Sequence, residues 1–179
     1  TQLRYMISPL NSFYAVGRVL AKPLERDTGT VAPIGQDARL ALPAGAAPAT
    51  VIVVVGETAR AANFGLNGYA RDTTPRLAQL PVASLRNVWS CGTSTATSLP
   101  CMFSHLGKDA FESRSSNHES LADVLQHAGL AVLWVDNQSG CKGICSRVPN
   151  VSTTALKVSP HCDSGECHDE VMLHGLDKR

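Results

Sequence analysis

The run of β-branched residues at positions 50–55, which ends at Gly56, constrains the fold more than any other part of the sequence. Its apolar stretch, residues 51–55, is far shorter than the ~18 residues that a membrane-spanning helix requires. A short apolar run without polar alternation is typical of a strand that is buried on both faces, as in a parallel sheet. The run therefore predicts a globular domain with a parallel sheet.

Other predicted elements alternate between strand and helix along the rest of the chain. Short strands are predicted at 85–89 and 130–135, and helices at 75–80, 94–106, 121–128 and 169–176. Thr74 is the expected N-cap of the first helix, and Ser116 with Glu119 forms a capping-box pattern before the helix that Gly129 ends. This alternation indicates an α/β fold with a largely parallel sheet flanked by helices.

Residues 1–48 differ in character from the rest of the chain. Apolar residues recur with loose helical spacing up to Val16, interrupted by Ser8 and Pro9, which predicts a short broken amphipathic helix. Such a helix could lie on a membrane surface, although packing against the domain is commoner. Proline and glycine then punctuate residues 21–48, which we interpret as a linker. No signal peptide is visible, so an export signal would lie outside this chain.

The six cysteines fall into three local pairs, although spacing alone leaves ~15 complete pairings open. Three disulfides that each close a short loop would indicate an oxidising compartment. The alternative is a structural zinc site made by the last two pairs with His161 and His168. Zinc would leave the first pair unexplained, so disulfides are favoured. The pairs are Cys91 with Cys101, Cys141 with Cys145, and Cys162 with Cys167.

The charge and aromatic content exclude one class of function. Sixteen Lys and Arg residues against fifteen Asp and Glu residues give a net charge of +1, and aromatic residues make up 5% of the chain. Neither a basic surplus nor a stacking platform is present to attract nucleic acid. We therefore expect no nucleic-acid partner.

Polar residues follow three of the predicted strands. Glu57 follows the first, a hydroxyl cluster at 93–98 follows the second, and the loop 136–142 with its amides and lysine follows the third. Ligands bind beyond the carboxyl ends of parallel strands, so we expect these groups to converge. Each also has a simpler explanation, as a helix cap, an ion-pair partner or a surface charge. The six histidines show no metal-ligand spacing such as HExxH.

Several long motifs follow one another from about residue 50 to the end of the chain. They are VVGETAR at 54–60, NGYARDTTP at 67–75, SCGTSTA at 90–96, PCMFS at 100–104, WVDNQSGCKG at 134–143 and CHDEVML at 167–173. In this order they resemble the motifs of the phosphoethanolamine transferases, bacterial inner-membrane enzymes that decorate lipid A and confer polymyxin resistance.

The resemblance implies an alkaline-phosphatase/sulfatase-like α/β domain in the periplasm, tethered to the inner membrane by a transmembrane region upstream. The expected division is then a membrane-proximal helix near residues 5–14 with its linker, 1–48, and the first portion of the catalytic domain, 49–179. Periplasmic disulfides are favoured further over a structural zinc site.

The resemblance also implies roles for individual residues. By motif position Glu57 corresponds to a zinc-ligand carboxylate, and Thr95 corresponds to the nucleophile, which also binds the Zn²⁺ cofactor. Asn137, Gln138 and Lys142 fall in the loop that lines the substrate head-group pocket. Phosphatidylethanolamine would give its phosphoethanolamine group to Thr95, and a lipid A phosphate would then accept it. Zinc favours the threonine alkoxide, and a helix starting at Thr95 would favour the phosphorylated intermediate.

Two departures from the family pattern qualify these expectations. Gln138 stands where many members have asparagine. The sequence also reaches Arg179 before any Asp-His pair, which in the family completes the zinc site. Glu57 and Thr95 alone cannot form a tetrahedral site, so the isolated chain is expected to be inactive. The alternatives are a transferase or sulfatase-like hydrolase of the same fold acting on lipopolysaccharide core or periplasmic glucan, and a non-catalytic remnant that binds lipid head groups.

Overall fold

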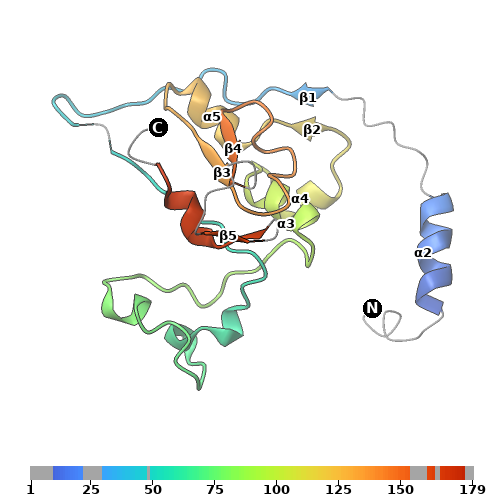
Figure 1. Ribbon diagram of the computed structural model, residues 1–179. Coiled ribbons are helices and arrows are strands. Elements are labelled where there is room, and N and C mark those ends of the chain that lie inside the picture. Colours follow the sequence, from blue (N-terminus) through green and yellow to red (C-terminus); the bar gives the residue numbers. More distant parts are fainter. Residues whose placement is uncertain (1–9, 22–29, 48, 154–160, 164–165, 176–179) are drawn as a thin grey trace. The chain divides into compact units, whose positions relative to one another are not determined.

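The computed structural model describes residues 10–21, 30–47, 49–153, 161–163 and 166–175, which fall into two compact units, 1–31 and 32–179 (Figure 1). No helix in these stretches is long and apolar enough to cross a membrane. Elements labelled η are 3₁₀ helices. In chain order the elements are α2 (Leu10–Ala21), β1 (Val31–Ala32), η1 (Ala61–Asn63), η2 (Gly65–Asn67), η3 (Leu77–Gln79), α3 (Thr95–Met102), α4 (Lys108–Glu112), β2 (Asn117–His118), α5 (Leu121–His127), β3 (Trp134–Asp136), β4 (Asn150–Ser152), β5 (Cys162–Asp163), β6 (Glu166–Cys167) and η5 (Asp169–Leu173).

Helix α2 belongs to the first unit. It extends beyond the predicted helix to Ala21, and the expected interruption at Ser8 and Pro9 lies outside the described residues. Phe13, Val16 and Leu20 are all exposed. Their spacing of three and four residues puts them on one helical face. The helix thus carries an apolar stripe, and its attachment to a membrane stays a prediction.

The strands predicted at 50–55 and 85–89 are not formed in the structure, so both predictions were wrong. Val54 is 81% exposed and Trp89 is 87% exposed, and neither segment belongs to a ladder. An apolar run becomes a buried strand only where neighbouring strands take up its backbone N–H and C=O groups and cover its faces. Among the described residues, no strand pairs with either run.

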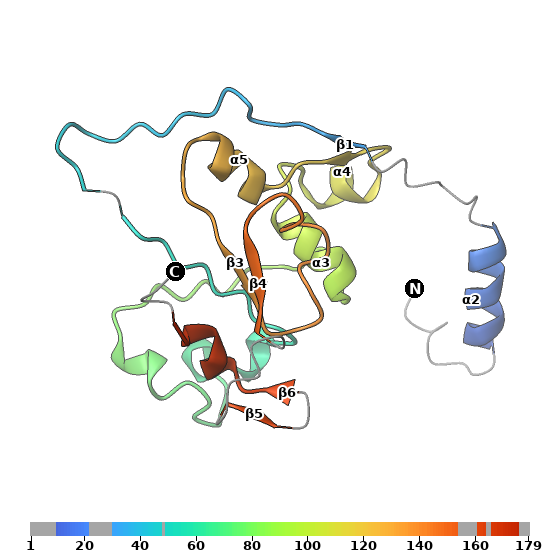
Figure 2. The ribbon, with the colours of Figure 1, turned by 45° about the horizontal axis from the view of Figure 1, so that its top comes forward.

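The parallel pairing expected of an α/β fold occurs between β3 and β4, which lie side by side in both views (Figures 1 and 2). Their register pairs Trp134 with Asn150 and Asp136 with Ser152. β3 begins later than the predicted strand 130–135, and β4 was not predicted. Two further two-stranded sheets join β1 to β2, and β5 to β6 in an antiparallel hairpin.

The predicted helices are present in shortened form. The helix predicted at 94–106 is α3, with Ser94 as its N-cap. The helices predicted at 75–80 and 169–176 are the short 3₁₀ helices η3 and η5. The Thr74 hydroxyl does not cap η3, because it accepts the N–H of Leu66, eight residues earlier in the chain.

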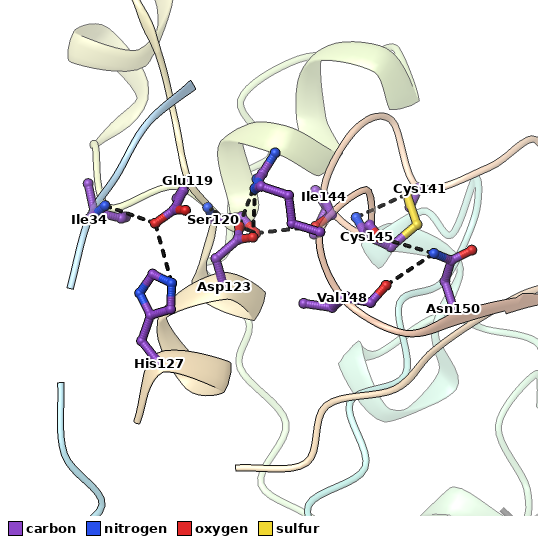
Figure 3. A network of polar contacts seen from close by, with 11 residues as sticks. Ile34, Glu119, Ser120, Asp123, His127, Cys141, Ile144, Cys145, Val148 and Asn150 are labelled. Atoms are coloured by element: carbon purple, nitrogen blue, oxygen red, sulfur yellow. Dashed lines mark hydrogen bonds and ion pairs between the residues drawn. A yellow bond between two sulfur atoms is a disulfide. The ribbon is translucent and has the colours of Figure 1, made fainter. Parts of the chain in front are cut away.

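The capping box of α5 lies four residues later than predicted. Ser120 is the N-cap, and its backbone N–H donates to Asp123 Oδ2 at 2.7 Å. Glu119 accepts the N–H of Ile34 instead, as Figure 3 shows. Gly129 follows the helix with a φ of +89°, a left-handed conformation that suits glycine, so the predicted helix end is confirmed.

The core of the second unit brings α3, α5 and the loop after β3 together. Phe103 and Trp134 pack edge to face beside it, with ring centroids 5.5 Å apart. The buried cluster of this core consists of Leu99, Ala122, Cys141, Ile144, Cys145 and Val148.

The structure contains three disulfides, Cys91–Cys101, Cys141–Cys145 and Cys162–Cys167, in place of the alternative zinc site.

Part of the segment interpreted as a linker packs closely against α5. The Leu40 N–H donates to the carbonyl oxygen of Ala128, and Gly35 lies against Val124. A Cβ added at Gly35 would come within 2.9 Å of the Val124 side chain, and the φ of Gly35 is +61°. Only glycine satisfies both the close approach and the backbone conformation.

Gly35→Ala is therefore expected to destabilise the protein by about 2 to 4 kcal/mol, the sum of left-handed strain and overpacking. Gly45→Ala is the matched control, because Gly45 also has a positive φ but an added Cβ would meet nothing within 4 Å. Its expected loss is about 1 kcal/mol. Urea unfolding of both variants measures the difference, and equal losses would show that the Val124 contact is unimportant.

Candidate functional site

Glu57 and Thr95, which lie 38 residues apart in sequence, meet in the structure. The Thr95 hydroxyl oxygen lies 3.1 Å from Oε1 and 3.0 Å from Oε2 of Glu57, so the hydroxyl hydrogen is directed at the carboxylate. Glu57 is exposed and Thr95 is half-buried. The pair is thus accessible to a ligand from solvent.

Helix α3 fixes the position of Thr95, which is its first residue. Ser94 has extended backbone geometry at the N-cap, and its carbonyl oxygen accepts the N–H of Thr97 at 3.0 Å. The disulfide Cys91–Cys101 ties the preceding loop to the last turn of the helix. Unpaired N–H groups and the positive end of the helix dipole favour negative charge at such a position.

Two non-glycine residues in the described part of the chain have a positive φ, and one is a predicted site residue while the other adjoins one. Thr58, next to Glu57, has a φ of +49°, and Lys142 has a φ of +52°. The left-handed region is unfavourable for a β-branched residue such as threonine. Strain of this kind concentrates at functional sites, where the surrounding structure imposes it.

The loop after β3 holds the three predicted head-group residues. Asn137 is half-buried, with its amide nitrogen 2.8 Å from Asp169 Oδ1. Gln138 is exposed. Lys142 bends back onto its own loop, since its Nζ lies 2.6 Å from the carbonyl oxygen of Ser139. No hydrogen bond or ion pair among the described residues joins this loop to Glu57 or Thr95, so the expected convergence is seen only for the first two groups.

The donor atoms of Glu57 and Thr95 fit a zinc ion in kind but not in number. Carboxylate oxygen is an ordinary zinc ligand, and a catalytic zinc site needs three protein ligands and an open position. Within the described stretches, no group of three or more His, Cys, Asp or Glu side chains could hold a metal ion. A complete zinc site would therefore need ligands from outside these residues.

Comparison with known proteins gives the family. The family model described as sulfatase matches residues 49–179. The chain belongs to the sulfatase family. Of solved structures, it is similar to the integral membrane protein lipooligosaccharide phosphoethanolamine transferase A (EptA) from Neisseria meningitidis, with 41% identity and a TM-score of 0.84 over 96% of this chain and 32% of that one.

Two relatives identified by sequence similarity are also named as transferases of this kind. Phosphoethanolamine transferase EptA of Salmonella typhimurium is 42% identical, covering 98% of this chain and 32% of the relative. Phosphatidylethanolamine transferase Mcr-1 of Escherichia coli is 37% identical, covering 98% of this chain and 34% of the relative. The chain thus spans about a third of the length of these relatives. The sulfatase-like fold and the resemblance to phosphoethanolamine transferases are both confirmed.

Sequence reasoning missed two contacts of the Asn137 side chain. Thr153 and the Cys167 carbonyl oxygen both bind the Asn137 side chain. The motif at 167–173 was a signal for the second of these, because it includes Cys167. Nothing in the sequence pointed to Thr153, since β4 was not predicted.

Proposed function

We propose that the full-length protein transfers phosphoethanolamine from phosphatidylethanolamine to a lipid A phosphate. The contact between Thr95 and Glu57 carries the proposal, because it presents a hydroxyl nucleophile at a helix N-terminus beside a carboxylate. The similarity to proteins named phosphoethanolamine and phosphatidylethanolamine transferases supports the group transferred and its donor.

In the proposed reaction, the Thr95 oxygen attacks the phosphorus atom of the donor. A bond from Thr95 to phosphorus forms as the hydroxyl loses its proton, and the bond from phosphorus to the diacylglycerol oxygen breaks, with that oxygen taking up a proton to leave as diacylglycerol. Glu57 orients the hydroxyl, and together with Thr95 it would hold Zn²⁺, whose chemistry when bound is Lewis-acid stabilisation of the alkoxide. An oxygen of a lipid A phosphate then attacks the same phosphorus atom, the bond from phosphorus to Thr95 breaks, and the released Thr95 oxygen takes up a proton from solvent to restore the free hydroxyl.

We place the reaction at the periplasmic face of the inner membrane. Three disulfides within the described residues support an oxidising compartment. A lipid donor and a lipid acceptor both require an enzyme that is close to the bilayer. We also expect reduced susceptibility to polymyxins, because added phosphoethanolamine lowers the negative charge of lipid A, which attracts cationic peptides.

Lipid A from Gram-negative cells that produce the full-length protein is expected to gain one phosphoethanolamine group. Mass spectrometry of lipid A, compared with cells carrying the empty vector, measures the gain. Unmodified lipid A together with modified lipopolysaccharide core or periplasmic glucan would instead assign another acceptor. Unmodified products of every kind, from well-expressed protein, would refute the transferase.

A further inference from the structure

The side-chain amide of Asn137 has no free hydrogen to donate. Its Nδ2 atom lies 3.0 Å from the carbonyl oxygen of Cys167 and 2.8 Å from Oδ1 of Asp169. A carboxamide nitrogen carries two hydrogens, and these two acceptors use both. The Oδ1 atom of Asn137 in turn accepts the hydroxyl hydrogen of Thr153. The amide is therefore committed to protein partners.

Thr153 is completely buried and touches no solvent. It directly follows β4, whose parallel register pairs Asp136 with Ser152, so it lies beside Asn137 at the ends of the two strands. Its hydroxyl also lies 3.2 Å from the carbonyl oxygen of Asp136. A buried hydroxyl needs a partner, and the two oxygens within reach of its single hydrogen belong to Asp136 and Asn137, where the chain leaves β3.

The loop that starts at Asn137 is held at both of its ends. At the far end, Cys141 is buried in the core and bound to Cys145. Between the ends, the Gly140 N–H donates to Asp136 Oδ2 at 3.0 Å. Gln138 lies exposed, and the ammonium of Lys142 keeps one hydrogen beyond the two that it gives to Ser139.

We propose that Asn137, held by the buried Thr153 on one side and the exposed Asp169 on the other, forms a clamp that positions the loop 138–142 for the phosphoethanolamine head group. Asn137 is then a positioning residue, and the direct contacts to the head group belong to Gln138 and Lys142. Thr153 acts through Asn137, because it is fully buried and cannot touch a substrate. The assignment of the loop to a head group rests on the proposed function, whereas the clamp rests on the contacts alone.

Thr153→Val in the full-length protein tests the clamp, because valine keeps the shape and removes the hydroxyl. The KM for phosphatidylethanolamine is expected to rise about tenfold with kcat within about twofold, the pattern of lost binding that is shared by ground and transition states. Thr153→Ser keeps the hydroxyl and is the matched control, with both constants expected within about twofold of the wild type.

A double-variant cycle separates positioning from direct contact. If Asn137 acts only within the clamp, combining Asn137→Ala with Thr153→Val should raise KM no further than either change alone. If the increases in KM of the two single variants multiply in the double variant, Asn137 contacts the head group directly, and the proposal is overturned. Asp169→Ala breaks the clamp from its exposed side, without opening the core, and is expected to raise KM about threefold even if the Thr153 variant does not fold.

Hydrogen–deuterium exchange of the loop gives a readout that needs no enzymatic activity. Faster exchange across residues 138–143 in Thr153→Val, and unchanged exchange in Thr153→Ser, would support the clamp. Equal exchange in both variants would overturn it. If the wild type transfers no phosphoethanolamine, the proposed function fails, and the exchange measurement still decides whether the clamp exists.

Discussion

Thr95→Ala in the full-length protein is expected to lower phosphoethanolamine transfer by about a thousandfold or more, because the covalent step has no other hydroxyl at its position. The protein should stay folded, since Thr95 is half-buried and its hydrogen bond goes to the exposed Glu57. Mass spectrometry of lipid A from cells producing the variant measures the loss, and thermal denaturation of the purified variant checks the fold.

Thr93→Ala is the matched control for this variant. Thr93 is an exposed residue in the loop before α3, two positions ahead of Thr95, and removal of its hydroxyl should leave transfer within about twofold of the wild type. The intact mass of the wild type, taken after incubation with donor and no acceptor, should show a phosphoethanolamine group that is absent from Thr95→Ala. Transfer that survives in Thr95→Ala would disprove the assignment of the nucleophile.

The meeting of Glu57 and Thr95 could be predicted from the sequence, although the strands used to predict it are not formed. The prediction rested on the carboxyl ends of two parallel strands, which Glu57 and the hydroxyl cluster 93–98 follow in the sequence. In the structure Thr95 is held instead by local features, the N-cap Ser94 and the disulfide Cys91–Cys101. Local signals of this kind survive in a sequence even where the long-range pairing of strands is absent.

The start of α5 could not be predicted, because two overlapping patterns compete there. Ser116 with Glu119 and Ser120 with Asp123 both fit a capping box. The choice depends on distant residues, since Glu119 binds the N–H of Ile34 and Asp123 binds Arg147. Ile34 lies 85 residues from Glu119, and Arg147 lies 24 residues from Asp123, so the local spacing of residues cannot reveal these contacts. The contact of Thr153 with Asn137 could not be predicted for the same reason, because it depends on the pairing of β4 with β3.

Asp123→Asn is expected to destabilise the protein by about 3 kcal/mol, because it removes the charge of a buried carboxylate that is bound to an arginine. The Asp123 side chain is 2% exposed and accepts two hydrogen bonds from Arg147, each at 2.7 Å. It also accepts the N–H and the hydroxyl of Ser120, as the network in Figure 3 shows. The neutral amide would leave Arg147 without its counter-charge. Asp72→Asn, at an exposed carboxylate, is the control and should change stability by less than about 0.5 kcal/mol.

The same carboxylate makes stability depend on pH in a direction that can be worked out. Burial alone would raise the pKa of Asp123, but the hydrogen bonds from Arg147 and Ser120 outweigh it and lower the pKa below its usual value of 3.8. A group with a lowered folded-state pKa binds protons more readily when unfolded, so its stabilising contribution is complete above about pH 4 and is lost as the pH falls toward the folded-state pKa. The difference in unfolding free energy between wild type and Asp123→Asn should therefore be constant from pH 5 to 7 and shrink below about pH 4. A difference that stays constant down to pH 2 would mean that Asp123 carries no charge-dependent share of the stability.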